Sequence, residues 1–470
     1  MKTYQDLLAL GENEKARMDF VLSAIEEHRS SSDYKIAEDA EKYASGKNTT
    51  IMSYQKLLYT VSGRAIPDNY SANHKCASGF YRRFLTQEVA VLLGNGVSFK
   101  DEKVKASLGA DFDKQLYFGV KSARKQKIAF GFWNRDHLEM FEYIEFVPLW
   151  DEEDGMLKAG IRFWRLDDQK PLRCTLYELD GYTDFIRRQG KDIEIMHEKR
   201  PYIVKTRENR IDGKEIYGGR NYPNFPIVPL WGAPERQSTL IGLREQIDCY
   251  DLIKSGFAND LDDASMIYWT ITNAGGMDDV DLAEFVQRIK TVHAATVDGT
   301  GNGTSAQAHT IDVPHESRET YLSRLSKDLY RDAMALDVDQ VAAGNITATQ
   351  IETAYEPLNE KLDEMEFCIL EFLDGIMALA NVQGAPTFTR SQIVNRQEEI
   401  DMVVSSADYL DDENVTRKIL TILGDGDAID DVLRRKAAEA SARYSVEEQM
   451  GGEDENAATG ENSGSDEGEE

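Results

Sequence analysis

The side chains that could carry out catalysis are dispersed along the sequence and form no known catalytic motif. No HExxH, CxxC or GxSxG pattern occurs, and the seven histidines, including His28, His74 and His137, have no regular spacing. The cysteines also lie far apart, at Cys76, Cys174, Cys249 and Cys368. That spacing favours free thiols over a disulfide framework or a zinc site. We therefore expect no catalytic site, no bound metal and no cofactor.

Three glycine-rich segments have the composition of ligand-binding loops but lack essential residues. The segment 298–304 (DGTGNGT) has no lysine in the spacing of a phosphate loop. Residues 94–96 (GNG) lack the third glycine of a dinucleotide fingerprint. Residues 424–427 (GDGD) lack the ligand register and the closing glutamate of a calcium loop. For 298–304 the composition favours a flexible loop that becomes ordered against a partner.

The charge balance argues against a conventional nucleic-acid-binding domain. The 470-residue chain carries a net charge of −30, whereas such domains present a basic patch. Residues 451–470 contain eight acids and no base, which predicts a disordered tail. The tail accounts for −8 of the −30, so the rest of the chain is also acidic, at −22. No stretch reaches the roughly 18 apolar residues that a membrane helix needs, and we expect no secretory signal.

Hydrophobic periodicity predicts an α+β chain, and its length predicts more than one lobe. Residues 1 to about 110 show apolar side chains at three- and four-residue spacing, which is typical of helices. Residues from about 116 to 231 are rich in aromatic and β-branched residues separated by turns, which indicates an antiparallel meander. Pro226 and Pro229 favour an edge strand for the last of these segments.

Two long helices are predicted on either side of a small unit at about 264–315. In the first helix, apolar residues recur at spacings of three or four from Leu240 to Leu261, and the opposite face is acidic. Within the unit, 266–272 and 290–297 read as strands and 280–289 as a helix. A second helix starts near Ser317. After a break at 337–346, a capping box over 347–350 begins a third helix, which Pro357 should kink.

Six segments resemble one protein family, and together they extend over nearly the whole chain except the acidic tail. They are SAIEEHRSSSDYKIAEDAEKYASGKNTTI (23–51), YRRFLTQEVAVLLGNGVSF (81–99), NFPIVPLWG (224–232), QSTLIGLREQIDCYDLIKSGFANDLDDASMIYWTIT (237–272), AAGNITATQIETAYEPLNEKLDEMEFCILEFLDGI (342–376) and FTRSQIVNRQEEIDMVVSSADYLDDENVTRKIL (388–420). Their order resembles that of the portal, or head–tail connector, proteins of long-tailed double-stranded DNA bacteriophages. Thr347 and Ala348, where the family usually has a small residue and then glycine, depart from the pattern.

The resemblance implies a portal fold with a fixed order of domains. Its parts would be a helical and antiparallel-β wing (1–235), a first stem helix (236–263), a small α/β clip (264–315), a second stem helix (316–337), a tunnel loop (338–347), a kinked wing helix with a strand (348–396), a helical crown (397–450) and the acidic tail (451–470).

The resemblance also implies a structural role in the virion and no enzymatic activity. The chain would form a homo-oligomeric ring at one capsid vertex, with twelve copies in the virion and twelve or thirteen in an isolated ring. It would be assembled in the host cytoplasm. Double-stranded DNA would pass through the ring without sequence specificity during packaging and ejection. The partners would be the terminase large subunit, a head-completion or adaptor protein, and the major capsid and scaffolding proteins, with no membrane.

Three groups of residues are candidates for contacts in such a ring. An acidic wall would let DNA slide, because basic contacts would hold its phosphates. The stem candidates are Glu245, Asp248, Asp251, Arg318, Arg324, Lys327 and Arg331. The tunnel-loop candidates are Asp337, Val338, Asp339, Gln340 and Val341. The clip candidates for binding an adaptor are Asp298, Gly299, Thr300, Gly301, Asn302 and Gly303.

The stem and tunnel-loop groups have alternative interpretations. The three stem acids are expected toward solvent or the channel, and a solvated helix face would look the same. The stem bases could touch phosphates or pair with acids of a neighbouring subunit. The break after the second helix could be an ordinary connection. At the level of the whole chain, the alternatives are another head-associated structural protein or a nucleic-acid-processing enzyme, and the missing phosphate loop argues against an enzyme.

Overall fold

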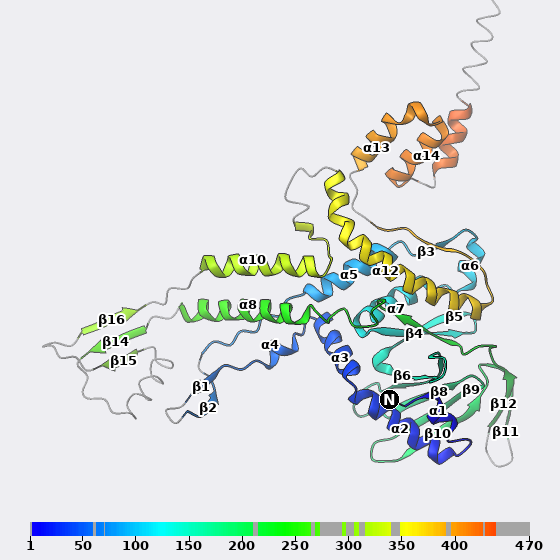
Figure 1. Cartoon of the computed structure of the whole chain (residues 1–470), viewed down its shortest axis with the longest axis horizontal. Helices are drawn as coiled ribbons and strands as arrows, with labels where there is room; N and C mark the ends of the chain where they lie inside the picture. The colour runs from blue at the N-terminus through cyan, green and yellow to red at the C-terminus, as the bar shows by residue number, and fades with distance from the viewer. Residues whose placement is uncertain are drawn as a thin grey trace, which may run out of the picture. The chain divides into compact units, whose positions relative to one another are not determined.

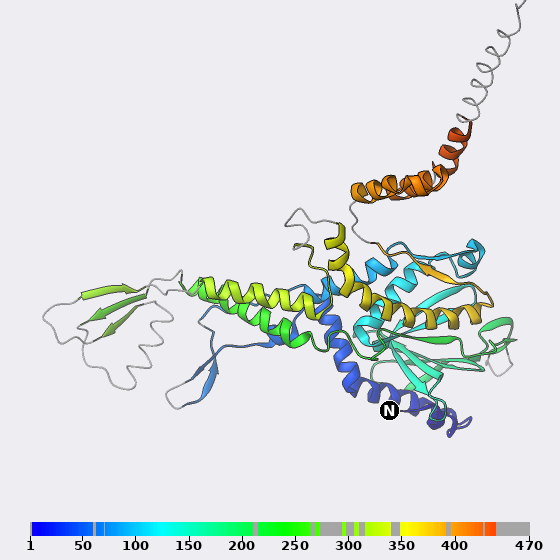
Figure 2. The same ribbon diagram turned by 45° about the horizontal axis from the view of Figure 1, so that its top comes forward.

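The computed structural model describes residues 2–59, 63–69, 71–209, 215–264, 268–272, 294–297, 305–309, 315–339, 348–391, 396–425 and 428–438. By their internal packing these fall into two units (Figures 1 and 2). The first comprises Met1–Gln340 and Tyr355–Ser391, and the second comprises Val341–Ala354 and Gln392–Glu470. The mixture of helices and largely antiparallel sheets is the expected α+β class. All four cysteines are free.

The N-terminal part is helical, as the periodicity predicts, but it also contains short strands. Its helices are α1 (Tyr4–Leu8), α2 (Glu14–Ser30), α3 (Ser32–Ala44), α4 (Thr49–Ser53), α5 (Phe80–Leu93), α6 (Glu102–Ser107) and α7 (Phe112–Gln126). The strands β1 (Leu57–Tyr59) and β2 (Ala65–Pro67) form an antiparallel hairpin. A third strand, β3 (Val97–Phe99), pairs with β17 (Pro386–Phe388), which lies within the part 348–396 where one strand is expected.

The antiparallel meander is confirmed, although it begins later than expected. Its strands are β4 (Ile128–Asn134), β5 (His137–Glu142), β6 (Phe146–Trp150), β7 (Leu157–Trp164), β8 (Leu172–Glu178), β9 (Gly181–Arg187), β10 (Ile193–Arg200), β11 (Ile203–Asn209), β12 (Glu215–Arg220) and β13 (Ile227–Trp231). They form a five-stranded sheet in the order β10-β9-β8-β7-β6, a three-stranded sheet β13-β4-β5 and the pair β11-β12. Pro229 lies in β13, which is an edge strand as expected.

The core of the first unit lies between the sheets and the helices that cover them. Helix α2 packs against β6, β7 and β10, and α7 packs against β4, β5 and β13. Helix α12 (Ala348–Ala380) approaches β4 so closely that a Cβ at Gly131 would lie 2.4 Å from Cζ of Phe372. Pro357 lies inside α12, and the helix continues through it.

Helices α8 (Arg244–Ala264) and α10 (His315–Asp332) lie side by side in both views, with three strands at their far end (Figures 1 and 2). The strands are β14 (Tyr268–Thr272), β15 (Ala294–Val297) and β16 (Ser305–His309). β14 pairs in parallel with β15 and antiparallel with β16. The strands expected in this part are therefore present, and the helix expected at 280–289 lies outside the described residues.

Both long helices are shorter than expected because the backbone turns next to them. Arg236 and Gly242 have positive φ, of 54° and 87°, so the chain reaches α8 through turns and not as a helix from 236. At the end of α10, Met334 has a φ of 50°. The Ala335 amide bonds the Tyr330 carbonyl at 2.9 Å and the Met334 amide bonds that of Arg331 at 3.0 Å. This Schellman motif ends the helix before 337.

The second unit is helical in its described part. It contains α13 (Arg396–Ser405), a 3₁₀ turn (Ala407–Tyr409) and α14 (Asp412–Leu423), and residues 429–438 are also helical. Asp411 caps α14 by accepting the Asn414 amide at 3.2 Å, and Gly424, with a φ of 88°, ends it. The acidic segment 451–470 lies outside the described residues.

Candidate interaction surface on the α8–α10 pair

Aromatic contacts join α8 and α10 to α5 at one end of the pair. Phe80 of α5 meets Tyr250 of α8 edge-on, with ring centroids 4.9 Å apart. Phe84 of α5 meets Tyr330 of α10 at 5.3 Å. Phe84 and Tyr330 belong to one buried cluster, and the partly buried Phe80 and Tyr250 pack against it, so burial of apolar area fixes this end of both helices.

A mixed contact joins α8 to α10 nearer the three strands. The Phe257 ring of α8 meets His315 of α10 edge-on at 5.8 Å. Arg318 of α10 pairs with Asp260 of α8 and lies 5.9 Å over the Phe257 ring. The structure therefore gives Arg318 a partner within its own chain, whereas the sequence interpretation expected it to touch phosphates or to pair with acids of a neighbouring subunit.

Polar side chains on α8 hold an extended segment, residues 71–79, against the helix. The Asn259 side chain accepts the His74 amide at 2.6 Å, and Ser255 Oγ accepts the Cys76 amide at 3.0 Å. Asp251 accepts the Ser78 amide at 2.9 Å. We call Asp251, Ser255 and Asn259 the α8 polar ladder; all three side chains are buried.

The expectation that Asp251 faces solvent or a channel is therefore wrong. Its exposed fraction is 0%, and its second oxygen accepts from Asn48 Nδ2 at 2.8 Å. Burial raises the pKa of Asp251, and these hydrogen bonds oppose the rise. Asp248 is also largely covered and accepts from the Tyr43 hydroxyl at 2.5 Å. Glu245, in contrast, is exposed.

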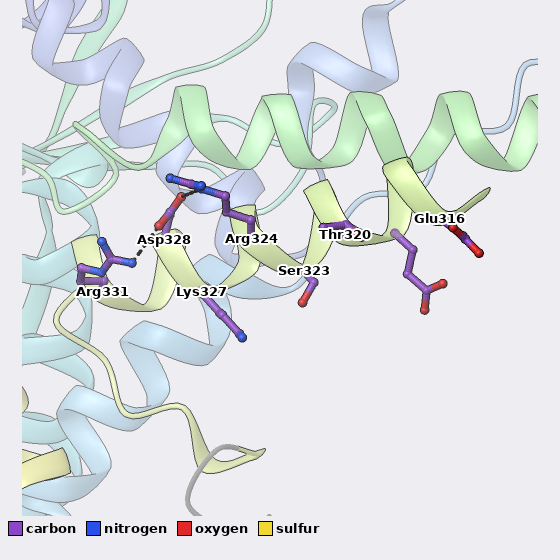
Figure 3. Close-up of a pocket in the computed structure, with 8 residues that line it drawn as sticks. Glu316, Thr320, Ser323, Arg324, Lys327, Asp328 and Arg331 are labelled. Carbon is purple, nitrogen blue, oxygen red and sulfur yellow. Dashed lines mark hydrogen bonds and ion pairs between the residues drawn. The ribbon is translucent and has the colours of Figure 1, made fainter. Parts of the chain in front are cut away.

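One face of α10 has no covering element within the described residues and presents charge of both signs (Figure 3). The residues on this face are Glu316, Glu319, Thr320, Ser323, Arg324, Lys327, Asp328 and Arg331. The acids Glu316 and Glu319 lie near the N-terminus of the helix and the bases nearer its C-terminus, which suits the helix dipole. Asp328 pairs with Arg324 at 3.7 Å and with Arg331 at 2.9 Å.

The residues that follow α10 are only partly described. Val338 is 46% exposed, and the Asp339 amide bonds the Asp337 carboxylate at 3.2 Å. Two of the tunnel-loop candidates, Gln340 and Val341, lie outside the described residues. So do all the clip candidates: Asp298, Gly299, Thr300, Gly301, Asn302 and Gly303.

The histidines sit in unrelated surroundings. His28 is buried and its Nε2 donates to the Tyr143 carbonyl at 2.9 Å. His74 lies 3.4 Å from Asp262 on the surface, and His137 lies 2.8 Å from Asp136. Across the described ranges, no cluster of three or more His, Cys, Asp or Glu residues could hold a metal ion. None of the helices in those ranges is both long and apolar enough to cross a membrane.

Comparison with known proteins identifies the family. The model of the phage portal protein family, SPP1 Gp6-like, matches residues 24–441. The chain belongs to this family. It is 29% identical over 207 residues to the portal protein of Clostridium phage phiCD119, covering 42% of this chain and 45% of the relative. It is 23% identical over 337 residues to the portal protein of Bacillus phage SPP1, covering 66% of this chain and 63% of the relative. Both matches thus span less than two thirds of the relative's length.

Membership of the phage portal family confirms the resemblance seen in the sequence. The family consists of structural head–tail connector proteins of the virion and not of enzymes. The α8–α10 pair and its polar ladder are therefore parts of a structural scaffold. The sequence could have revealed the ladder, because polar side chains recur every four residues along α8, at 251, 255 and 259, which places them on one face.

Proposed function

We propose that this chain assembles into a closed ring of twelve copies at one vertex of the capsid, in which the α8–α10 pairs surround a channel for double-stranded DNA. The observation that carries the proposal is the sparse burial of α10. Of its 18 residues, Leu329 and Tyr330 are buried, and both lie in the last turn. A helix of that length draws most of its stability from packing. Neighbouring copies in a ring would supply that packing along the rest of α10.

The charge on the chain suits a conduit. A duplex carries one negative charge per about 1.7 Å of its axis, so a basic wall would hold it. The net charge of −30 favours sliding instead, without sequence readout. In this proposal the exposed bases of α10, Arg324, Lys327 and Arg331, pair with acids of a neighbouring copy or touch phosphates briefly. Asp337, Val338 and Asp339, together with Gln340 and Val341, lie toward the DNA.

The partners follow from the same assembly. The three-stranded sheet β14–β16 and the segment 298–303 would meet the terminase large subunit during packaging and a head-completion protein afterwards. Residues of the N-terminal helical part and of the second unit would meet major capsid and scaffolding proteins. The ring would form in the host cytoplasm and become part of the virion.

Negative-stain electron microscopy of the purified chain, combined with native mass spectrometry, tests the proposal. We expect rings of twelve or thirteen copies with a central channel at least as wide as a duplex, about 20 Å. A chain that stays monomeric across a wide range of salt and protein concentrations contradicts the proposal.

A further inference from the structure

Helix α5 contacts the chain on both sides of the segment that links α10 to α12. Gln87 of α5 makes two hydrogen bonds with one residue: its Nε2 donates to the Leu336 carbonyl and its Oε1 accepts the Leu336 amide, both at 3.0 Å. Leu336 is buried, so no solvent competes for these groups. A single side chain thus holds the backbone four residues beyond the end of α10.

Arg83 and Glu88 extend this contact along α5. Arg83 donates to the Tyr330 hydroxyl of α10. That hydrogen bond raises the pKa of Arg83, and the charges of Asp339 and Asp337 add to the effect, which places both acids within electrostatic reach of Arg83. Arg83 and Gln87 are four residues apart, so they share one face of α5.

Glu88 connects the same helix to α12. Its carboxylate is 2% exposed, accepts from Arg124 Nε at 2.9 Å, and pairs with Lys361 of α12. Burial alone would raise the pKa of Glu88, but Arg124 and Lys361 outweigh burial and lower it, so the carboxylate stays charged. Lys361 also donates to the Ala333 carbonyl at 2.7 Å. Lys361 therefore joins α12, α5 and the end of α10.

The backbone at this junction is held in an unfavourable conformation. Met334 has a φ of 50°, a region that a side chain with a Cβ seldom occupies. Such a conformation persists only where the surrounding contacts determine it. Here Lys361 holds the residue before Met334 and Gln87 holds Leu336, two residues after it.

We propose that Arg83, Gln87 and Glu88, the α5 clamp, are positioning residues that set where Asp337, Val338 and Asp339 leave the body of the subunit. The inference rests on the proposed function in one respect: these residues matter for DNA only if they face the channel. Because α5 and α7 are joined through Glu88 and Arg124, a force on α7 would reach residues 337–339 through the clamp.

Hydrogen exchange of the full-length chain tests the clamp. In Gln87→Met, which keeps the length of the side chain but removes both polar atoms, we expect the Leu336 amide to exchange about tenfold faster. In Gln87→Glu the carboxylate still accepts that amide but cannot donate to the Leu336 carbonyl, so the exchange rate should lie between those of the parent and of Gln87→Met. The matched control is Thr86→Ala, an exposed neighbour on α5. Unchanged exchange in Gln87→Met, or equal acceleration of the α5 amides, overturns the proposal.

A second readout separates this inference from the proposed function. Capsids assembled with rings of the parent or of Gln87→Met are compared for the rate of DNA packaging with terminase and ATP. We expect both to form rings and Gln87→Met to package several-fold more slowly, with Gln87→Glu restoring part of the rate. If the rings form and the packaging rate of Gln87→Met equals that of the parent, the proposed role of the clamp is overturned, whereas the proposed function as a ring still stands. A parent that forms no rings contradicts the proposed function, and the exchange result still decides whether the clamp exists.

Discussion

The carboxylate of Asp251, in the middle of α8, accepts the backbone amide of Ser78 at 2.9 Å and is wholly buried. A helix residue and an extended segment 173 positions away thus share a hydrogen bond that excludes water. With Ser255 and Asn259 the same face of α8 satisfies the amides of Cys76 and His74. The polar face of α8 is therefore a binding surface for the subunit's own chain.

Replacing Asp251 with alanine should destabilise the subunit by about 2–3 kcal/mol, because the Ser78 amide and the Asn48 amide group lose a buried charged acceptor. Glu245→Ala, on the exposed side of the same helix, should change stability by less than about 0.5 kcal/mol. Urea unfolding of the two variants beside the parent measures both effects. Equal urea midpoints for Asp251→Ala and the parent would show that the hydrogen bonds of Asp251 contribute nothing to the stability of the subunit.

The sheets and the order of the elements could be predicted from the sequence because their signals are local. Aromatic and β-branched residues between turn segments indicate strands such as β7, and Pro229 indicates an edge strand. Helix α7 was missed although Asp113 in its first turn and Arg124 and Lys125 in its last turn are helix-end signals. Its Asp111 cap makes no side-chain hydrogen bond, and it ends on Lys127, with a φ of 80°, where a glycine is usual.

The candidate surface was harder to predict because it depends on which segment covers which helix face. A run of acids on α8 indicates an exposed face when read alone. Asp251 is buried because the segment 71–79 brings unpaired backbone amides to it, and that segment has no periodic pattern of its own. The contacts of Gln87 with Leu336 could not be predicted either, because the two residues lie 249 positions apart and no local sequence pattern indicates that they meet.

Acid should destabilise the subunit partly through His28. Burial lowers the pKa of His28 to about 4, although its hydrogen bond to the Tyr143 carbonyl opposes the shift. The unfolded chain has a His pKa near 6.5, so protonation favours unfolding. The stability is fully present above about pH 6.5 and is lost as the pH falls toward 4, by about 3 kcal/mol.

The variant His28→Gln isolates this contribution, because glutamine can still donate to the Tyr143 carbonyl but does not titrate. Urea unfolding of parent and variant at pH 8, 6 and 4.5 gives the free energy of unfolding of each protein as a function of pH. The acidic residues contribute equally to the pH dependence of both proteins. We expect the parent to lose stability more steeply between pH 6.5 and 4.5. Parallel slopes would mean that His28 is not a source of acid sensitivity.

Reversing the charge of Lys327 should impair assembly without affecting the fold of the subunit. Lys327 is exposed, and its side chain projects from the open face of α10 (Figure 3). Lys327→Glu should shift subunit stability by less than about 0.5 kcal/mol and lower the fraction of chains in rings several-fold. Lys35→Glu, on the exposed side of α3, is the control for net charge. Native mass spectrometry gives the fraction of chains in rings for each variant. Equal fractions for the two variants would show that this face of α10 is not part of the interface between subunits.

Two glycine substitutions should have opposite effects, because one glycine is packed and the other is not. A Cβ at Gly131 of β4 would lie 2.4 Å from Cζ of Phe372, so Gly131→Ala must displace α12 and should cost about 1–3 kcal/mol. Gly256 lies inside α8, and a Cβ added there would meet no atom within 4 Å, so Gly256→Ala should stabilise the helix by about 0.5–1 kcal/mol. Thermal unfolding of the two variants beside the parent shows whether each substitution raises or lowers the unfolding midpoint. A rise in midpoint for Gly131→Ala would contradict the close packing of α12 on the sheet, whereas a fall for Gly256→Ala would reveal a neighbour over that face of α8.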